Sequence, residues 1–194
     1  MTAKFSFVIA LLFCLTSPAK KHPDSPVEWG LRAVKEAMIA VPKDKEVCFS
    51  PDERCDVKLW KFIQTAQKTL DVAVYDITHP KIVHEILVAS KKIKVRVVVD
   101  RKQSKGEHSL VDLLIKGGAA VKFGKQRGIM HNKFTVVDGA RLETGSFNYS
   151  NNATNNNQEN QLYLEDPAAV RRYADRFEKM WSEGKAADLS IAKY

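Results

Sequence analysis

Residues 131–148 hold polar side chains whose types suit chemistry at a phosphate ester. The neutral imidazole of a histidine such as His131 can attack phosphorus and leave again, so that one hard displacement becomes two easier ones through a covalent phosphohistidine. Lys133 and the amide of Asn148 can hold the charge that develops on the non-bridging oxygens, and Ser146 can donate a further hydrogen bond. The residue types therefore favour nucleophilic catalysis at phosphorus, with His131 as the nucleophile.

The spacing of these residues is more informative than their types. A lone histidine on a strand is usually a surface or satisfied core residue, and an Asp-Gly pair alone is an ordinary turn. The string runs His131-Asn-Lys133, four residues, Asp138, six residues, Gly145-Ser146-Phe-Asn148. It resembles the signature H-x-K-x(4)-D-x(6)-G-S-x-N of the phospholipase D superfamily and matches each fixed position. The chain is most similar to the small single-motif bacterial endonucleases of that superfamily, over roughly three quarters of its length from about Val47.

The resemblance implies roles for two further residues and a partner. Glu159 stands where the superfamily has a carboxylate that orients the imidazole by accepting a hydrogen bond from its second nitrogen. Asp138 is expected to secure the hairpin or a neighbouring loop rather than to touch substrate. Because the chain has one motif and the leaving group needs a proton donor, the resemblance implies a homodimer. Two copies of His131 would share one site, one as nucleophile and the other as general acid.

A second H-x-K string, His79-Pro80-Lys81, does not repeat the motif. Ile86 stands where the motif needs aspartate, and no G-S-x-N follows at the required distance. His79, His84 and His108 are the alternative proton donors within one chain, and we consider them less favourable than a second copy of His131.

The substrate class is argued from charge. The chain has 31 Lys+Arg against 23 Asp+Glu, and its formal net charge of +8 suits an anionic partner. The basic residues expected on the surface include Lys91, Lys92, Lys94, Arg96, Arg101, Lys102 and Lys105. With the Asn-rich segment 149–158, they favour a hydrolase that tracks the backbone of DNA or RNA with little base readout, an endonuclease. The alternatives are a phospholipase D acting on phospholipid headgroups or cardiolipin, and a noncatalytic nucleic-acid-binding module, which needs no nucleophilic imidazole.

No cofactor or metal site is expected from the sequence. The histidines are scattered, and the cysteines lack the further ligands that a zinc site would need. Lysine side chains would take over the electrostatic role of a metal ion, so the sequence predicts activity that survives chelators.

The motif residues are expected on a β-hairpin. In the strand that begins after Met130, His131, Lys133 and Thr135 would fall on one face, and the residues between them on the other. Asp138-Gly139 predicts the turn, which sets Ser146 opposite His131; a longer register would bring Asn148 there instead. Cross-strand neighbours lie about 5 Å apart, so both ends of the hairpin could grip one small anion.

Strands and helices alternate along the rest of the chain. The expected helices cover about 26–40, 57–63, 80–91, 110–116 and 167–181, and the expected strands 46–49, 70–75, 93–100, 120–123 and 159–164. This alternation predicts one α/β domain over residues 20–194, a mixed β-sheet sandwiched between helices. The resemblance implies the αβα sandwich of the phospholipase D superfamily, with a C-terminal β-hairpin that carries the active site.

The N-terminus reads as a secretory signal. A positive start through Lys4, the apolar run Phe5–Leu15 and small residues up to Ala19 predict a signal peptide over residues 1–19. The protein is then periplasmic or secreted; the alternative is an uncleaved N-terminal segment that anchors it to a membrane. Cleavage would remove Cys14 and leave Cys48 and Cys55, a pair expected to form a disulfide in an oxidising compartment.

Overall fold

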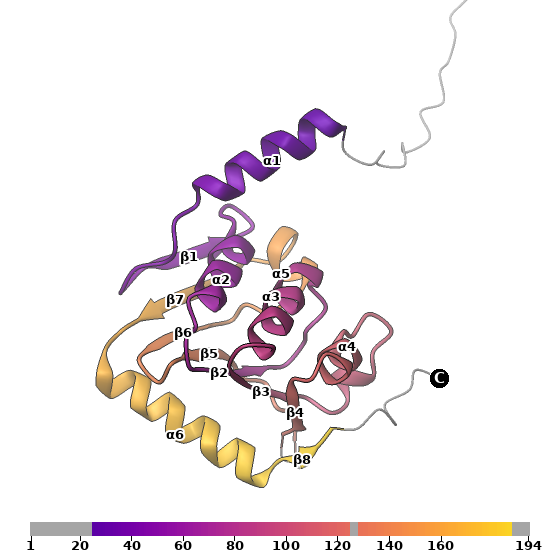
Figure 1. The fold of residues 1–194 in the computed structure, drawn as a ribbon, viewed down its shortest axis with the longest axis vertical. Coiled ribbons are helices and arrows are strands. Elements are labelled where there is room, and N and C mark those ends of the chain that lie inside the picture. The colour runs from indigo at the N-terminus through magenta and orange to yellow at the C-terminus, as the bar shows by residue number, and fades with distance from the viewer. Residues whose placement is uncertain (1–24, 125–127, 188–194) are drawn as a thin grey trace, which may run out of the picture. The chain divides into compact units, whose positions relative to one another are not determined.

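The computed structural model describes residues 25–124 and 128–187 (Figure 1). The expected signal peptide lies outside the described residues. The chain divides into two compact units, residues 1–37 and 38–194, which are described separately. In the described part of the chain, no helix is long and apolar enough to cross a bilayer.

All but the last residue of helix α1 (Pro26–Met38) belongs to the first unit. A capping box begins it, because the Ser25 amide donates to Glu28 Oε2 at 2.6 Å and the Glu28 amide donates to Ser25 Oγ at 3.3 Å. The predicted helix is therefore present, two residues shorter than expected. None of residues 26–38 is buried, and the apolar residues Val27 and Leu31 on its expected inner face are exposed.

The second unit is built on one mixed sheet. Eight strands of the described residues pair in the order β1-β7-β6-β5-β2-β3-β4-β8. Their bounds are β1 (Val47–Ser50), β2 (Thr69–Val74), β3 (Lys94–Val99), β4 (Ala120–Phe123), β5 (Lys133–Val137), β6 (Arg141–Gly145), β7 (Glu159–Leu164) and β8 (Lys185–Ala186). Strands β2, β3 and β4 run parallel, as expected from the helices that connect them, and the other pairs are antiparallel.

Helices cover both faces of this sheet. Their bounds are α2 (Cys55–Gln64), α3 (Pro80–Ser90), α4 (Val111–Lys116), α5 (Asn151–Asn155) and α6 (Pro167–Glu183). Figure 1 shows α2, α3 and α4 on one face and α6 on the other. The core has two parts, one for each layer of helices. In one part, Leu59 and Ile82 pack against the sheet, and in the other Phe177 packs with Phe134 and Val136. The predicted fold class, an α/β sandwich with a mixed sheet, is confirmed.

Three short elements escaped the sequence analysis. One is the 3-10 turn η1 (Gln103–Lys105), another is β8, and the third is α5 within the segment expected to be a loop. Helix α5 begins because Ser150 Oγ accepts a hydrogen bond from the Ala153 amide at 3.2 Å. Asparagine has a low helix propensity, so the composition of this segment pointed to a loop.

The hairpin of β5 and β6 is present, but its register differs from both predicted ones. Phe134 pairs with Thr144 and Val137 with Arg141, which would set Phe147 opposite His131 if the pairing continued. The reason lies in the turn: Asp138 and Gly139 have φ values of 54° and 62°, and the Ala140 amide closes it by donating to the Val137 carbonyl. Ala140 is then an additional residue before β6 begins, and it shifts the register.

Arg96 does not belong to the basic surface, contrary to the prediction. It is buried on β3, where its guanidinium donates to both carboxylate oxygens of Asp71 at 2.7 and 2.8 Å and to Glu178 at 2.6 and 3.1 Å. The hydrogen bonds that Arg96 donates to Asp71 raise the pKa of Arg96. The residue therefore joins the sheet to α6. The other six predicted basic residues are exposed.

The predicted disulfide is confirmed. Cys48 on β1 and Cys55 at the start of α2 are bonded, with their Cα atoms 5.7 Å apart, and both side chains are buried. The bond closes a loop of about seven residues and fixes α2 against the edge of the sheet.

Candidate active site

The start of β5 places the first two motif residues. His131 precedes the strand and is exposed, whereas Lys133, its first residue, is buried. Lys133 Nζ donates a hydrogen bond of 2.9 Å to the backbone carbonyl of His131. The ammonium group is therefore held beside the predicted nucleophile.

Tyr75 belongs to this site, although the sequence analysis placed it only in a strand. Its ring centroid lies 4.7 Å from that of His131, with the rings tilted by 58°, and Lys133 Nζ lies 5.3 Å from the Tyr75 centroid. Tyr75 follows β2, whose last residue, Val74, pairs with Lys133. Only this antiparallel pairing brings the ring to the motif, and no local signal in the sequence indicates it.

Lys133 stands in a desolvated environment with two carboxylates. Burial lowers the pKa of Lys133, and the charges of Glu159 and Asp76 oppose that effect. Burial also raises the pKa of Asp76, which accepts a hydrogen bond from Gln103. A partly buried ammonium interacts more strongly with a phosphate anion than an exposed one does, because water screens the pair less. The environment therefore suits the stabilisation of charge at phosphorus.

The end of β6 is tied tightly to β7. Ser146 Oγ donates to Glu159 Oε2 and accepts from the Asn160 amide at 3.1 Å. Gly145 approaches the same strand so closely that a Cβ atom there would lie 2.1 Å from the Asn160 carbonyl oxygen. The glycine of the motif is therefore a steric requirement, and Glu159 positions Ser146.

The expected contact between Glu159 and His131 is not made within the chain. The second oxygen of Glu159 accepts from Asn157 Nδ2 at 2.9 Å, and nothing in residues 25–124 or 128–187 makes a hydrogen bond to the imidazole of His131. Glu159 thus acts here through Ser146 and through its charge near Lys133.

Asn148 is half-buried beside a segment that follows β2. Its Oδ1 atom is buried and has no hydrogen-bond partner among the described residues. The next residue, Tyr149, donates its amide to the Asp76 carbonyl at 3.0 Å and accepts from the amides of Thr78 and His79. Backbone bonds therefore fix the position of Asn148 in the site.

A buried polar network lies under Tyr149. Its hydroxyl is hydrogen-bonded to Thr135 Oγ1 and donates to Glu143 Oε2 at 3.1 Å, and all three residues are fully buried. Burial raises the pKa of Glu143 to about 8, so this carboxyl is mainly protonated at neutral pH. The sequence analysis did not identify Glu143, which looks like an ordinary strand residue.

Asp138 lies at the turn of the hairpin, away from these groups. Its carboxylate accepts from the backbone amides of Gln67, Lys68 and Thr69 at 2.7 to 3.1 Å. Burial alone would raise the pKa of Asp138, but these hydrogen bonds lower it. The contacts match the expected role, because they secure the loop that leads into β2.

His79 has a structural task that explains its isolated H-x-K string. It caps α3, with Nδ1 accepting from the Ile82 amide at 3.4 Å, and its Nε2 lies 3.7 Å from Asp56 Oδ2. His84 is exposed on α3. No group of three or more His, Cys, Asp or Glu side chains in the described ranges could hold a metal ion.

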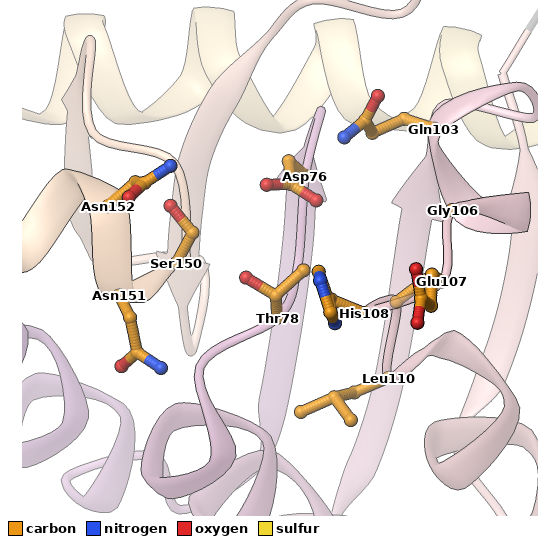
Figure 2. A pocket seen from close by; sticks show the side chains of 11 residues that line it. Asp76, Thr78, Gln103, Gly106, Glu107, His108, Leu110, Ser150, Asn151 and Asn152 are labelled. Atoms are coloured by element: carbon orange, nitrogen blue, oxygen red, sulfur yellow. The ribbon is translucent and has the colours of Figure 1, made fainter. Parts of the chain in front are cut away.

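A cavity of about 650 Å³ lies on the Asp76 side of the site (Figure 2). Figure 2 shows Ser150, Asn151 and Asn152 on one side of it and Gln103, Glu107 and His108 on the other. Asp76 and Thr78 lie between these groups. The cavity adjoins the reacting groups, because Asp76 directly follows Tyr75, whose ring contacts His131, and the amide of Tyr149, next to Asn148, donates to the Asp76 carbonyl.

Comparison with known proteins identifies the family. The family model described as "Cardiolipin synthase, PLD-like domain" matches residues 59–181. A mitochondrial cardiolipin hydrolase of Xenopus tropicalis is 34% identical over 127 residues, which is 65% of this chain and 60% of that protein. The chain spans less than two thirds of the length of this and the next cardiolipin hydrolases that it matches.

Two solved structures share the fold over nearly their whole length. The phospholipase D family member Nuc from Salmonella typhimurium superposes with a TM-score of 0.69 and 25% identity, over 73% of this chain and 96% of that one. NucT from Helicobacter pylori gives a TM-score of 0.69 and 26% identity, over 74% and 99%. The matched family model, these structures and the complete motif show that the chain belongs to the phospholipase D superfamily.

Proposed function

We propose that the protein is a metal-independent phosphodiesterase that cleaves nucleic acid internally, as an endonuclease. A nitrogen of His131 attacks phosphorus, the bond to the leaving oxygen breaks, and a general acid protonates that oxygen. Water then attacks the phosphohistidine, which releases the imidazole and a phosphate monoester. Lys133, Ser146 and Asn148 stabilise the oxygens of phosphorus during both steps.

The lining of the cavity that adjoins the motif is the observation that favours nucleic acid over lipid as the substrate. Its walls are amides, hydroxyls, carboxylates and an imidazole, and Leu110 is the one large apolar side chain among the described residues that line it. A phospholipase needs apolar surface to admit acyl chains. The exposed lysines after β3, such as Lys102 and Lys105, also suit a polyanionic strand.

The names of the cardiolipin hydrolases favour a second substrate, an anionic phospholipid. A third reading is a noncatalytic nucleic-acid-binding module, but pure binding gives no reason for a nucleophilic imidazole next to a desolvated ammonium. A single set of assays distinguishes these three functions. We compare the purified protein with His131→Ala on plasmid DNA, RNA, and vesicles that contain choline lipid or cardiolipin, with EDTA present throughout.

Cleavage of nucleic acid in EDTA by the wild type, lost in His131→Ala while binding persists, is the expected result. Turnover of cardiolipin alone would make the protein a phospholipase. Equal turnover by His131→Ala would refute the nucleophile, and nucleic-acid activity that EDTA abolishes would refute the metal-independent mechanism. Binding without any turnover would leave the noncatalytic module.

We also propose that the active form is a homodimer in which two copies of His131 complete one site. The exposed imidazole of His131, which makes no hydrogen bond within the described residues, supports a site that a second chain completes. Mixing wild-type chains with His131→Ala chains at a constant total concentration tests this after the subunits have exchanged. With half the chains mutant, activity falls to about a quarter if both histidines are needed, and to about a half if each chain works alone.

The protein is further proposed to act in the periplasm or outside the cell. The disulfide between Cys48 and Cys55 supports an oxidising compartment. The mass of the protein recovered from the periplasm and the medium tests this, because cleavage near Ala19 predicts a chain that begins at about residue 20. Recovery of the full-length chain from the membrane fraction would instead show an uncleaved anchor.

A further inference from the structure

The cavity in Figure 2 is formed by three segments that are distant in sequence. Residues 76–78 follow β2, residues 103–110 follow β3, and residues 150–152 begin α5. Backbone bonds hold the segments together: the Leu110 amide donates to the Ile77 carbonyl at 3.0 Å, and the Tyr149 amide donates to the Asp76 carbonyl. The cavity is therefore a preformed part of the fold.

The charge of this cavity is opposite to that of a phosphate site. Among the described residues that line it, none is lysine or arginine, whereas Asp76 and Glu107 are acidic. A phosphate in the cavity would meet two carboxylates, whereas the ammonium of Lys133 lies at the start of β5, where it donates to the His131 carbonyl. The reacting phosphate is therefore held at Lys133, and the cavity receives an uncharged part of the substrate next to it.

The polar groups in the walls offer both donors and acceptors. Thr78, His108 and Asn151 carry side chains that can do either. Asn152 uses its oxygen to accept from Asn156 Nδ2 at 2.8 Å, which leaves its amide hydrogens as donors. Half-buried Leu110 adds an apolar surface. Such a lining suits a flat ring with donors and acceptors on its edge, joined to a sugar whose hydroxyls a carboxylate can bind.

We infer that the cavity is a subsite for the nucleoside next to the scissile phosphate of a single-stranded nucleic acid. The inference rests on the proposed function and adds the form of the substrate. A volume of about 650 Å³ is within the usual range of small-molecule sites and is large enough for one nucleoside. A base stacked and paired in a duplex could enter only after being turned out of the helix, which costs a few kcal/mol. Single strands are therefore the preferred substrates.

The test measures how much a base contributes to cleavage. The substrates are a single-stranded 12-mer, the same length of duplex, and a 12-mer in which every base is absent and only the sugar–phosphate chain remains. Each is assayed as DNA, and the base-bearing strand also as RNA. Wild type, Asn151→Leu and His108→Phe are compared with Asn155→Leu, a control on the same helix that is exposed and does not line the cavity.

The wild type should cleave the base-bearing single strand about tenfold faster, in kcat/KM, than the abasic strand, and faster than the duplex. Asn151→Leu and His108→Phe should each remove most of that base-dependent ratio, and Asn155→Leu should keep it. Only the ratio of the kcat/KM values on the base-bearing and abasic strands is compared, so a general loss of folding or catalysis affects both values equally and leaves the ratio unchanged.

Two results would overturn the inference while the proposed function stands. One is a wild-type enzyme that cleaves the abasic strand or the duplex as fast as the base-bearing single strand. The other is an unchanged ratio in both cavity variants. A wild type that cleaves no nucleic acid but hydrolyses cardiolipin would overturn the proposed function and the nucleoside subsite together.

Discussion

Replacing Glu143 by glutamine should remove a strong dependence of stability on pH. The carboxyl of Glu143 is fully buried, and its one hydrogen-bond partner in the described structure is the Tyr149 hydroxyl. Ionisation would leave an unpaired negative charge inside the core, which is why burial raises its pKa to about 8. Glutamine keeps the size of the side chain and an acceptor for Tyr149, and it cannot ionise.

The magnitude follows from the two pKa values. The pKa of Glu143 rises from 4.5, the ordinary value, to about 8 in the native state. Between these values the unfolded chain releases a proton that the native chain keeps, so the free energy of unfolding falls as pH rises. The contribution of the Glu143 carboxyl to the free energy of unfolding is complete below pH 4.5 and lost by about pH 8. At about 1.4 kcal/mol for each pH unit, the whole change is about 5 kcal/mol.

Urea unfolding of wild type and Glu143→Gln at pH 5, 6, 7 and 8 measures this change. The stability of the variant relative to wild type should increase by about 1.4 kcal/mol for each unit of pH. A constant difference between the two proteins does not matter, because only the slope is tested. Asp175→Asn, at an exposed position on α6, is the control and should run parallel to wild type. Parallel curves for Glu143→Gln would refute the argument that Glu143 is protonated in the native core.

Two further substitutions test close contacts elsewhere in the fold. Gly145→Ala should lower the free energy of unfolding by about 1–3 kcal/mol and also reduce kcat/KM, because a Cβ atom 2.1 Å from the Asn160 carbonyl oxygen must displace Ser146. Thermal unfolding and cleavage assays check this. Gly30→Ala is the control, because a Cβ atom there would have no atom within 4 Å. Arg96→Met should lower the free energy of unfolding by about 3–5 kcal/mol in urea, since it leaves the buried carboxylate of Asp71 unpaired, whereas Lys94→Met on the same strand should change little. A loss in Arg96→Met no larger than that in Lys94→Met would contradict this account.

Local patterns were sufficient to predict most elements of the fold. The β-branched run that became β3 and the capping box that begins α1 depend only on residues adjacent in sequence. The turn at Asp138-Gly139 was also predicted, but not the additional residue Ala140, and the hairpin register was wrong for that reason. A turn signal names the residues with positive φ and does not fix how many residues follow before pairing resumes.

The parts of the site that sequence analysis missed come from tertiary contacts. Tyr75 reaches His131 only because β2 pairs with β5, and Arg96 turned inward because Asp71 lies beside it on the neighbouring strand. Charge at a single position cannot distinguish a buried ion pair from a solvated side chain. Glu143 was missed for the same reason, since its role depends on Tyr149 being buried next to it.

The site separates the chemistry from the choice of substrate. The residues that would act at phosphorus lie on or beside the hairpin of β5 and β6, and the motif fixes their spacing. The cavity next to them is built from residues 76–78, 103–110 and 150–152, none of which belongs to the motif. Relatives can therefore keep one mechanism and differ in substrate by changing these three segments. For this chain, the polar and acidic walls of those segments, and not the motif, are the reason to expect a nucleoside rather than an acyl chain beside the reacting phosphate.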